Sequence, residues 1–294
     1  MPIADVIARS RRKWRQIASS ELALPGKIAY CFDSALGFFR PPLRTGHRKY
    51  RLKGGARVLL RENSTDRKVF DEIFLEKTYA GFAEADSRPD VAAAPLILID
   101  LGANVGLSAI ALARQLRPQG IVAVEPDGAS FAMLQQNLRL AGLSERSKAI
   151  RAFAGAERGF AELVDSGNGA WGMRMGACVR AGIPVWRIED LAAVALHLFV
   201  GVNAPARILL KCDVEGAEAQ IFQSLACWDH LVERVILELH TEFFSAASLR
   251  RCLDGSHYLW RVEGEIAPDA VLAVIALERG ELRKTPQTQR AAVS

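Results

Sequence analysis

Three short segments of the chain carry side chains that could bind a polar ligand or accept a proton. They are residues 100–106 (DLGANVG), 213–218 (DVEGAE) and 238–240 (ELH), and each follows a short apolar run. Apolar runs of this length are typical of strands that are buried in a parallel sheet. Since such strands present ligand-binding residues at their carboxyl ends, we expect the three segments to meet at one edge of the sheet.

The first segment predicts a site for a nucleoside. Gly102 and Gly106 permit a tight turn and a close approach of the backbone to a ligand. The next apolar run ends at Glu125, where an acid at the end of the second strand can accept both hydroxyls of a ribose. An ordinary strand–helix–strand crossover with incidental glycines is the alternative, and Glu125 makes it the weaker one.

Asn104 and Asp100 indicate which nucleoside the segment binds. A dinucleotide site needs a glycine at the position of Asn104, so that the pyrophosphate can touch the helix N-terminus. Asp100 would add a negative charge near the phosphates. A ligand without phosphate and with a positively charged end fits better, and S-adenosylmethionine is such a ligand. A nicotinamide-dependent oxidoreductase is the alternative that Asn104 disfavours.

The other two segments offer candidate proton acceptors. His240 ends a predicted strand, and its unperturbed pKa near neutrality suits proton acceptance from a hydroxyl. Asp213 directly follows a predicted strand, where its alternative role is a helix cap. Glu215 and Glu218 lie in the first turn of a predicted helix, where the dipole alone favours acids. We retain Glu215 as a catalytic candidate and give Glu218 a structural role.

Metal and disulfide chemistry find little support in the sequence. Asp213 with His240 could hold a divalent ion, but no set of His, Asp and Glu has a spacing typical of a metal site. We therefore expect metal-independent catalysis. The five cysteines are odd in number and form no CxxC pair, which favours a reducing compartment and predicts a cytoplasmic protein.

Alternating strands and helices must position these side chains. The repeated units predict an α/β fold with a mainly parallel sheet covered on both faces. We expect strands over 96–101, 121–124, 149–153, 208–211 and 235–239, helices over 107–116, 130–140 and 214–225, and a closing hairpin of 258–263 with 270–277.

The remaining regions are less regular in pattern. A helix is expected over residues 3–18 and another over 69–82, whereas 25–55 is expected to be irregular because glycines and prolines interrupt it. Residues 155–182 hold seven glycines together with Trp171, which predicts a loop above the crevice. Such a loop could close over a substrate, with Trp171 stacked on a sugar face, or form a surface connection only.

The net charge of +5 conceals a basic N-terminal region. Residues 1–61 contain 14 Lys and Arg against three acids, a net charge of +11, whereas the remaining chain is mildly acidic. A basic amphipathic arm can contact an anionic membrane surface weakly, and its few aromatics argue against nucleic acid as a partner. The alternative is an arm that packs onto its own domain or onto a second subunit.

Four of these segments, taken in order, resemble the FkbM family of S-adenosylmethionine-dependent methyltransferases. They are residues 99–106 (IDLGANVG), 122–127 (VAVEPD), 210–218 (LKCDVEGAE) and 236–240 (ILELH). Upstream, residues 61–66 and 73–79 resemble the entry segment of that family. The likeness covers about residues 58–280 and departs from the family pattern at 187–190.

The resemblance implies a class I, Rossmann-like methyltransferase sheet of seven strands with an antiparallel last strand. It also implies methylation of a hydroxyl on a sugar, a glycan or a hydroxylated natural product, with S-adenosylmethionine as cofactor. The cofactor residues that it implies are Gly102, Asn104 and Gly106 on the methionine and ribose side, Asp100 near the ammonium, Glu125 on the ribose, Phe153 near the adenine, and Asp66 and Tyr79 as a lid. Asp213, Glu215 and His240 remain the catalytic candidates.

The chain thus divides, by expectation, into three parts. A basic helical or irregular arm covers 1–57, the methyltransferase domain covers 58–281, and 282–294 form a disordered tail. A non-catalytic module that keeps the nucleoside pocket is the further alternative, and the presence of Asp213 and His240 weighs against it.

Overall fold

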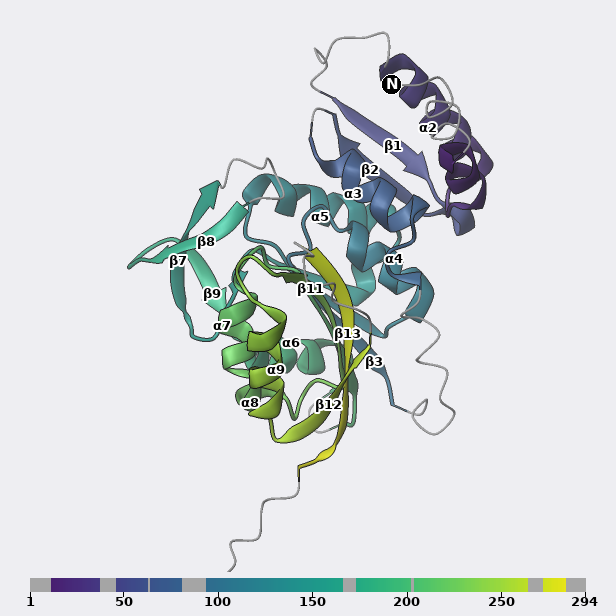
Figure 1. Ribbon diagram of the computed structural model, residues 1–294. Helices are drawn as coiled ribbons and strands as arrows, with labels where there is room; N and C mark the ends of the chain where they lie inside the picture. The colour runs from purple at the N-terminus through teal and green to yellow at the C-terminus, as the bar shows by residue number, and fades with distance from the viewer. Residues whose placement is uncertain are drawn as a thin grey trace, which may run out of the picture.

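The centre of the fold is a seven-stranded sheet with helices on both faces (Figure 1). The computed structural model describes residues 12–37, 46–62, 64–80, 94–165, 173–201, 204–263 and 272–283. The sheet has the strand order β12-β13-β11-β10-β3-β4-β5. Their bounds are β3 Leu96–Leu101, β4 Gly120–Val124, β5 Ser147–Ile150, β10 Arg207–Cys212, β11 Arg234–His240, β12 Tyr258–Glu263 and β13 Leu272–Leu282.

The direction of the strands completes the topology. The pairs β10–β11, β10–β3, β3–β4 and β4–β5 are parallel, whereas β13 is antiparallel to both β11 and β12. This order, with one reversed strand between its neighbours, is that of a Rossmann-like class I methyltransferase sheet. The fold class expected from the sequence is therefore confirmed.

Alternation along each strand sends apolar side chains to two separate cores. In β3, Leu98 faces one core while Ile97 and Ile99 face the other, because successive side chains of a strand point to opposite faces. Helices α4 (Leu107–Leu116) and α5 (Gly128–Leu140) cover the Leu98 face. The opposite face is covered by α6 (Ile188–Phe199), α7 (Glu218–Gln223), α8 (Leu225–Trp228) and α9 (Ala246–Asp254).

The N-terminal region is folded rather than irregular, which corrects the expectation for residues 25–55. Residues 12–19 are helical, α2 spans Leu24–Gly37, and β1 (His47–Arg51) pairs with β2 (Arg57–Arg61). The expected boundary after residue 57 thus falls inside a hairpin. Tyr30 of α2 and Tyr50 of β1 are fully buried, and their ring centroids lie 5.8 Å apart. Aromatic burial of this kind compensates for the glycines and prolines that interrupt the pattern.

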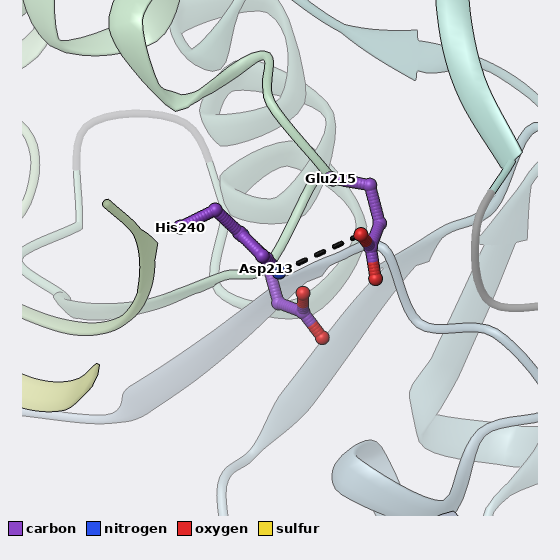
Figure 2. A group of neighbouring side chains, drawn as sticks. All are labelled: Asp213, Glu215 and His240. Carbon is purple, nitrogen blue, oxygen red and sulfur yellow. Dashed lines mark ion pairs between the residues drawn. The ribbon is translucent and has the colours of Figure 1, made fainter. Parts of the chain in front are cut away.

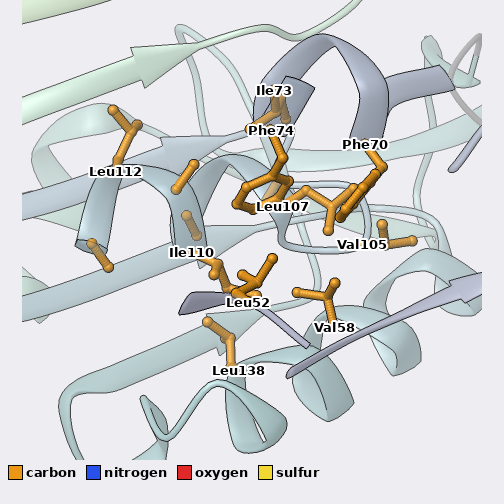
Figure 3. Packing of buried hydrophobic residues seen from close by; sticks show 14 of the residues in the cluster. Leu52, Val58, Phe70, Ile73, Phe74, Val105, Leu107, Ile110, Leu112 and Leu138 are labelled. Atoms are coloured by element: carbon orange, nitrogen blue, oxygen red, sulfur yellow. The ribbon is translucent and has the colours of Figure 1, made fainter. Parts of the chain in front are cut away.

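This N-terminal unit shares one core with the sheet. The expected helix over 69–82 is a shorter helix, α3 (Asp66–Phe70), followed by a π-helical segment, Asp71–Leu75. Phe70 and Phe74 pack beside Leu107 and Ile110 of α4, together with Leu52 and Val58 (Figure 3). The N-terminal region therefore lies on the same face of the sheet as α4 and α5.

A second, smaller sheet forms where the sequence predicted a glycine-rich loop. Its strands are β6 (Phe153–Ala154), β9 (Ile183–Trp186), β7 (Gly159–Asp165) and β8 (Met173–Cys178), in that order. The strand expected over 149–153 is divided between the two sheets, since β5 ends at Ile150 and Phe153 pairs with Val185. Trp171 lies outside the described residues.

The last strand of the sheet, β13, extends to Leu282, and residues 284–294 lie outside the described part of the chain. No helix within the described ranges has both the length and the apolar character that crossing a bilayer requires.

Asn137 links the N-terminal hairpin to the main domain. Its buried side chain accepts a hydrogen bond from Leu59 N (2.7 Å) and donates to the carbonyl oxygens of Leu59 (2.9 Å) and Val105 (2.8 Å). We predict that Asn137→Ala lowers the free energy of unfolding by about 2–5 kcal/mol, because three buried backbone groups lose their partner. Chemical denaturation followed by circular dichroism measures the loss.

The matched control is Gln136→Ala, which removes an exposed amide from the same helix. It is expected to change the free energy of unfolding by less than about 0.5 kcal/mol. A loss below about 1 kcal/mol for Asn137→Ala would show that the hairpin does not depend on this link.

Candidate active site

A cavity of about 300 Å³ opens where β3, β4, β10 and β11 end. It lies at the carboxyl edge of the parallel strands, the place where open α/β sheets bind their ligands. Twelve of the described lining residues are polar or charged, namely Lys68, Glu72, Thr78, Tyr79, Asn104, Ser108, Glu125, Lys211, Asp213, Glu215, Glu238 and His240, and Gly102 and Phe153 also line the cavity. The three segments singled out in the sequence therefore meet, as the parallel strands require.

The turn after β3 has the backbone that the glycines predicted. Gly102 (φ +69°), Asn104 (φ +48°) and Gly106 (φ +86°) are all left-handed, a region that glycine adopts freely and Asn tolerates. A Cβ on Gly102 would lie 1.7 Å from the carbonyl oxygen of Asp213, and one on Gly106 would meet Leu134 at 2.8 Å. Packing against the protein itself thus requires both glycines, and Gly106 is not among the residues that line the cavity.

Glu125 is held at the end of β4 by backbone hydrogen bonds. Its Oε2 accepts from Asn104 N and its Oε1 from Asp127 N, both at 2.8 Å. Burial raises the pKa of Glu125 to about 7, although these two bonds lower it in part. The carboxylate lines the cavity beside Asn104, whose buried Oδ1 has no hydrogen-bond partner. A ligand hydroxyl could satisfy both acceptors.

Asp100 does not reach the cavity, which corrects its expected role beside a ligand ammonium. Its fully buried carboxylate accepts from Ser108 Oγ at 2.6 Å and lies 3.6 Å from Lys211 Nζ. The Lys211 ammonium also contacts Asp213 Oδ2 at 3.0 Å and donates to the carbonyl oxygen of Gly102. Burial would lower the pKa of Lys211, but Asp213 and Asp100 raise it well above its ordinary value. Lys211 is therefore a fixed internal cation between two strands.

His240 is held between two glutamates at the end of β11, and Figure 2 shows its ion pair with one of them, Glu215. Its Nδ1 lies 2.7 Å from Oε1 of the fully buried Glu218, and its Nε2 lies 3.5 Å from Glu215 Oε2. Glu218 also accepts from Gly216 N at 2.8 Å, so the first turn of α7 fixes its position. Glu215 is a non-glycine residue with a φ of +51°, a strained conformation that is typical of functional sites.

The pKa of His240 differs from the value near neutrality that was expected from the sequence. Burial lowers the pKa of His240, but Glu218, Asp213 and Glu215 together raise it to about 9, so the ring is a cation at neutral pH. Burial and the neighbouring Asp213 raise the pKa of Glu215 to about 7, against a lowering by His240. The group that titrates near neutrality is therefore Glu215 rather than His240.

A second acid that lines the cavity, Glu238, is partly buried. Tyr79 donates a hydrogen bond to Glu238, which precedes His240 by two residues on the same strand face. Burial and Asp213 raise the pKa of Glu238 to about 7, and burial together with Glu238 raises the pKa of Tyr79 well above its ordinary value. Tyr79 thus lines the cavity through a contact with Glu238 that the sequence did not indicate, and its role as a lid over a cofactor stays a prediction.

Of the two remaining cofactor candidates, Phe153 lines the cavity and Asp66 does not. Phe153 lines the cavity at the start of the small sheet, while its ring also packs with Ala161 and Val185. Asp66 is fully buried outside the cavity lining, where Arg61 Nη2 binds its Oδ1 at 2.8 Å and Arg61 N donates to its Oδ2 at 2.8 Å. The expectation that Asp66 forms a lid over a ligand is therefore corrected, because its carboxylate anchors β2 to α3.

Asp213, Glu215 and His240 are also the donor set in the described chain that could hold a metal ion. One ligand atom of each lies within 4.8 Å of the others. Two features compete with a metal there. The His240 ring carries its proton up to a pKa of about 9, and Lys211 already occupies Asp213 Oδ2. A metal would have to displace that proton before it could bind the ring.

Sequence reasoning missed Lys211, Glu238 and the role of Glu218. The signal for the first two was present, since each is a charged residue inside an otherwise apolar strand. A period of two from Leu209 and Ile236 places both on one face of the sheet. Glu218 could not be distinguished from a helix-terminal acid without the position of His240.

The chain is similar in sequence to one known methyltransferase. No family model matches the chain. Over 221 residues the sequence is 27% identical to Methyltransferase 1 of Beauveria bassiana (strain ARSEF 2860), an alignment that covers 66% of this chain and 82% of that protein. This likeness supports a methyltransferase.

Two solved structures are similar to this chain at low identity. The methyltransferase FkbM from Methylobacillus flagellatus KT is 16% identical with a TM-score of 0.42, over 67% of this chain and 47% of that one. TYW2 of M. jannaschii in complex with AdoMet is 11% identical with a TM-score of 0.37, over 80% of this chain and 86% of that one. This chain thus spans less than half of the FkbM structure.

The pairing of His240 with Glu218 gives the site a measurable titration. We predict that His240 titrates near 9 by heteronuclear NMR, and that Glu218→Gln moves its pKa toward the ordinary value of 6.5, since the neutral amide no longer favours the imidazolium. Because the folded pKa is raised, the stabilisation from the charged ring is complete below the ordinary value and is lost as the pH rises through about 9.

Glu242→Gln serves as the control, because this carboxylate follows His240 by two residues yet pairs with Arg174. It is expected to leave the His240 titration unchanged. A wild-type ring that titrates near 6.5, or a Glu218→Gln ring that still titrates near 9, would contradict the pairing.

Proposed function

We propose that this protein is an S-adenosylmethionine-dependent methyltransferase that transfers a methyl group to a hydroxyl of a sugar, a glycan or a hydroxylated natural product. The observation that carries the proposal is the distribution of charge in one cavity. Glu125 and the unpartnered Asn104 Oδ1 lie at one part of its lining, and Asp213, Glu215 and Glu238 lie at another. An uncharged ribose suits the first group, and a sulfonium with an ammonium suits the second.

The charge of the lining also argues against a phosphate-bearing cofactor. Five carboxylates border the cavity within the described chain, which are Glu72, Glu125, Asp213, Glu215 and Glu238, whereas its cations are Lys68, Lys211 and His240. Lys211 is engaged by Asp213 and Asp100, and His240 by Glu218. A pyrophosphate would meet uncompensated negative charge, so a nicotinamide dinucleotide fits less well than S-adenosylmethionine.

The residues of the chain divide the work of the reaction. Bound S-adenosylmethionine supplies the electrophile, a methyl group on a sulfonium, for in-line displacement by the acceptor oxygen. Glu125 accepts hydrogen bonds from the ribose hydroxyls, and Phe153 offers an apolar surface for the adenine. Lys211 and the Glu218–His240 pair hold Asp213 and Glu215 in place at the other part of the lining. Positioning of the hydroxyl supplies a large part of the rate enhancement.

Glu215 is the proton acceptor that the electrostatics favour. Its carboxylate has a pKa of about 7, so it is available as a base at neutral pH and its conjugate acid is weak enough to keep the proton. The hydroxyl proton would pass to Glu215 as the acceptor oxygen takes the methyl group that bound S-adenosylmethionine would supply, with S-adenosylhomocysteine as the second product. His240, a cation up to about 9, orients Glu215 rather than accepting the proton itself.

The aromatic content of the cavity supports a hydroxyl acceptor over a nucleobase. Within the described lining, Phe153 and Tyr79 are the aromatic residues. Phe153 is assigned to the adenine, and Tyr79 is bound to Glu238. Stacking of a second base would require a further ring, because nucleic-acid sites rely on such platforms.

The cofactor half of the proposal predicts a specific loss of affinity. Glu125→Ala should weaken S-adenosylmethionine binding by about 1–3 kcal/mol, because the ribose hydroxyls lose a charged acceptor. Wild-type affinity should also fall below pH 7, where Glu125 becomes protonated. Isothermal titration calorimetry with S-adenosylmethionine measures both effects. A parallel titration with NAD tests the alternative cofactor.

Glu145→Ala is the control, since Glu145 is exposed and does not line the cavity. Unchanged affinity in a folded Glu125→Ala protein would place the ribose elsewhere. Tight binding of NAD without binding of S-adenosylmethionine would overturn the proposal as a whole.

The catalytic half predicts a pH-dependent rate. With a sugar, glycoside or polyketide acceptor that supports turnover of radiolabelled S-adenosylmethionine, kcat should rise with pH through about 7, as Glu215 loses its proton. Glu215→Gln should lower kcat by roughly 10²–10⁴-fold, the usual contribution of a general base, while cofactor affinity stays within a few-fold.

The variants Asp213→Asn and His240→Asn distinguish positioning from proton transfer. Each should lower kcat but keep a pH profile governed by Glu215. A rate loss below about tenfold for Glu215→Gln would indicate that the proton leaves directly to water.

A further inference from the structure

Helix α2 exposes a row of large apolar side chains on its outer face. Leu24, Ile28 and Phe32 are 71%, 63% and 62% exposed, and they follow one another at intervals of four residues. Residues spaced by four lie on the same face of a helix. We call these three residues the outer stripe.

The packing of α2 explains why the outer stripe points away from the protein. Its opposite face carries the buried Tyr30, whose hydroxyl donates to Asp71 and whose ring packs near Phe70. Gly26 is also on the packed face, since a Cβ there would lie 2.3 Å from the carbonyl oxygen of Arg51. The helix is thus anchored by one face, and the apolar residues of the other face are available to a partner.

The neighbouring helix over residues 12–19 also carries exposed side chains. Ile17 is buried and Lys13 pairs with Asp71 at 2.5 Å, which fixes the inner face of this helix. Trp14 is 61% exposed, and Arg12 and Arg15 are exposed beside it. Lys27 of α2 donates to the carbonyl oxygen of Ala18, so the two helices lie next to each other.

The charge of this region is positive, and the two acids that the structure describes within residues 1–61 are paired. Glu21 pairs with Arg114 at 2.9 Å and Asp33 with Arg48 at 2.8 Å, whereas Arg12 and Arg15 form no ion pair with another described residue. Residues 1–61 carry a net charge of +11. Exposed apolar side chains next to these two arginines form a combined hydrophobic and basic surface.

We propose that the outer stripe, with Trp14, Arg12 and Arg15, docks the protein onto an anionic lipid bilayer. Apolar side chains of an interfacial helix enter the headgroup boundary, while the arginines pair with lipid phosphates. Trp is favoured at this depth because its ring is amphipathic. A second copy of the chain is the less favourable occupant, since face-to-face contact would bring two regions of charge +11 together.

Binding of this kind is reversible and depends on two signals. Four apolar side chains and two arginines give weaker attachment than a membrane-spanning helix, and salt screens the electrostatic part. The proposal is independent of the methyltransferase assignment, because none of these residues lines the cavity.

Co-sedimentation of the full chain with sucrose-loaded vesicles tests the docking. We expect binding to phosphatidylcholine vesicles that contain phosphatidylglycerol, and little binding to phosphatidylcholine alone. Ile28→Ser with Phe32→Ser, and separately Arg12→Gln with Arg15→Gln, should each reduce the bound fraction on anionic vesicles, with apparent affinity falling roughly tenfold. Salt should weaken the binding of the wild type.

The controls remove exposed apolar and basic side chains that lie elsewhere on the protein. Leu198→Ser with Phe160→Ser deletes two apolar side chains that are 50% and 44% exposed, and Arg250→Gln deletes an exposed charge of α9. These variants should bind like the wild type. Because all substituted side chains are exposed, circular dichroism should show unchanged folding.

Depth-dependent quenching provides a second measurement on the wild type. Brominated lipids should quench a fluorescence component that is missing from Trp14→Phe. The docking surface is overturned by three outcomes: the absence of vesicle binding, binding that ignores lipid charge, or stripe variants that bind like the controls. Sedimentation in which the stripe variants instead dissociate a dimer would assign the surface to a second copy.

Discussion

Two internal cations hold the carboxyl edge of this sheet together. The Lys211 ammonium contacts Asp100 and Asp213, and the His240 ring contacts Glu215 and Glu218, so four carboxylates are kept within one small region. Without these cations, like charges at this separation would repel each other strongly in a poorly solvated site. The cavity therefore depends on charge pairing across strands β3, β10 and β11 as much as on apolar packing. Glu215 and Asp213, which carry the proposed chemistry, are positioned by His240 and Lys211.

The same arrangement connects the topology of the fold to its proposed function. A mainly parallel sheet brings the ends of β3, β4, β10 and β11 to one edge, and the reversed β13 covers the far side of β11. Glu125 at the end of β4 and Glu215 after β10 consequently border one cavity. A nucleoside with a cationic end matches this separation of roles, since one group binds neutral hydroxyls and the other stabilises positive charge. The segment that follows the N-terminal hairpin completes the cavity, because α3 supplies Lys68 and the π-helical segment supplies Glu72.

Sequence patterns predicted the central sheet well because burial on both faces leaves a strong signal. Leu96–Leu101 and Leu107–Leu116 have the expected bounds, and Glu125 and His240 fall at the expected strand ends. The N-terminal region was predicted poorly, because the glycines and prolines of 25–55 mask a helix whose order comes from the buried Tyr30 and Tyr50. Asp66 was misassigned for a similar reason, since its partner Arg61 could not be recognised from spacing alone. The pKa of His240 depends on Glu218, which is distant from it along the chain, so the sequence offered only the unperturbed value.

The central claim is that one cavity holds the nucleoside at Glu125 and presents the sulfur to the Glu215–His240 pair. A crystal structure of the full chain with S-adenosylhomocysteine tests it most directly, because the product complex locates every part of the cofactor at once. The account predicts ribose hydroxyls within hydrogen-bond distance of the Glu125 carboxylate, the adenine against Phe153, and the sulfur facing the side where Glu215 and His240 lie. A nucleoside bound outside this cavity, or bound in it with the sulfur directed away from Glu215, would contradict the account.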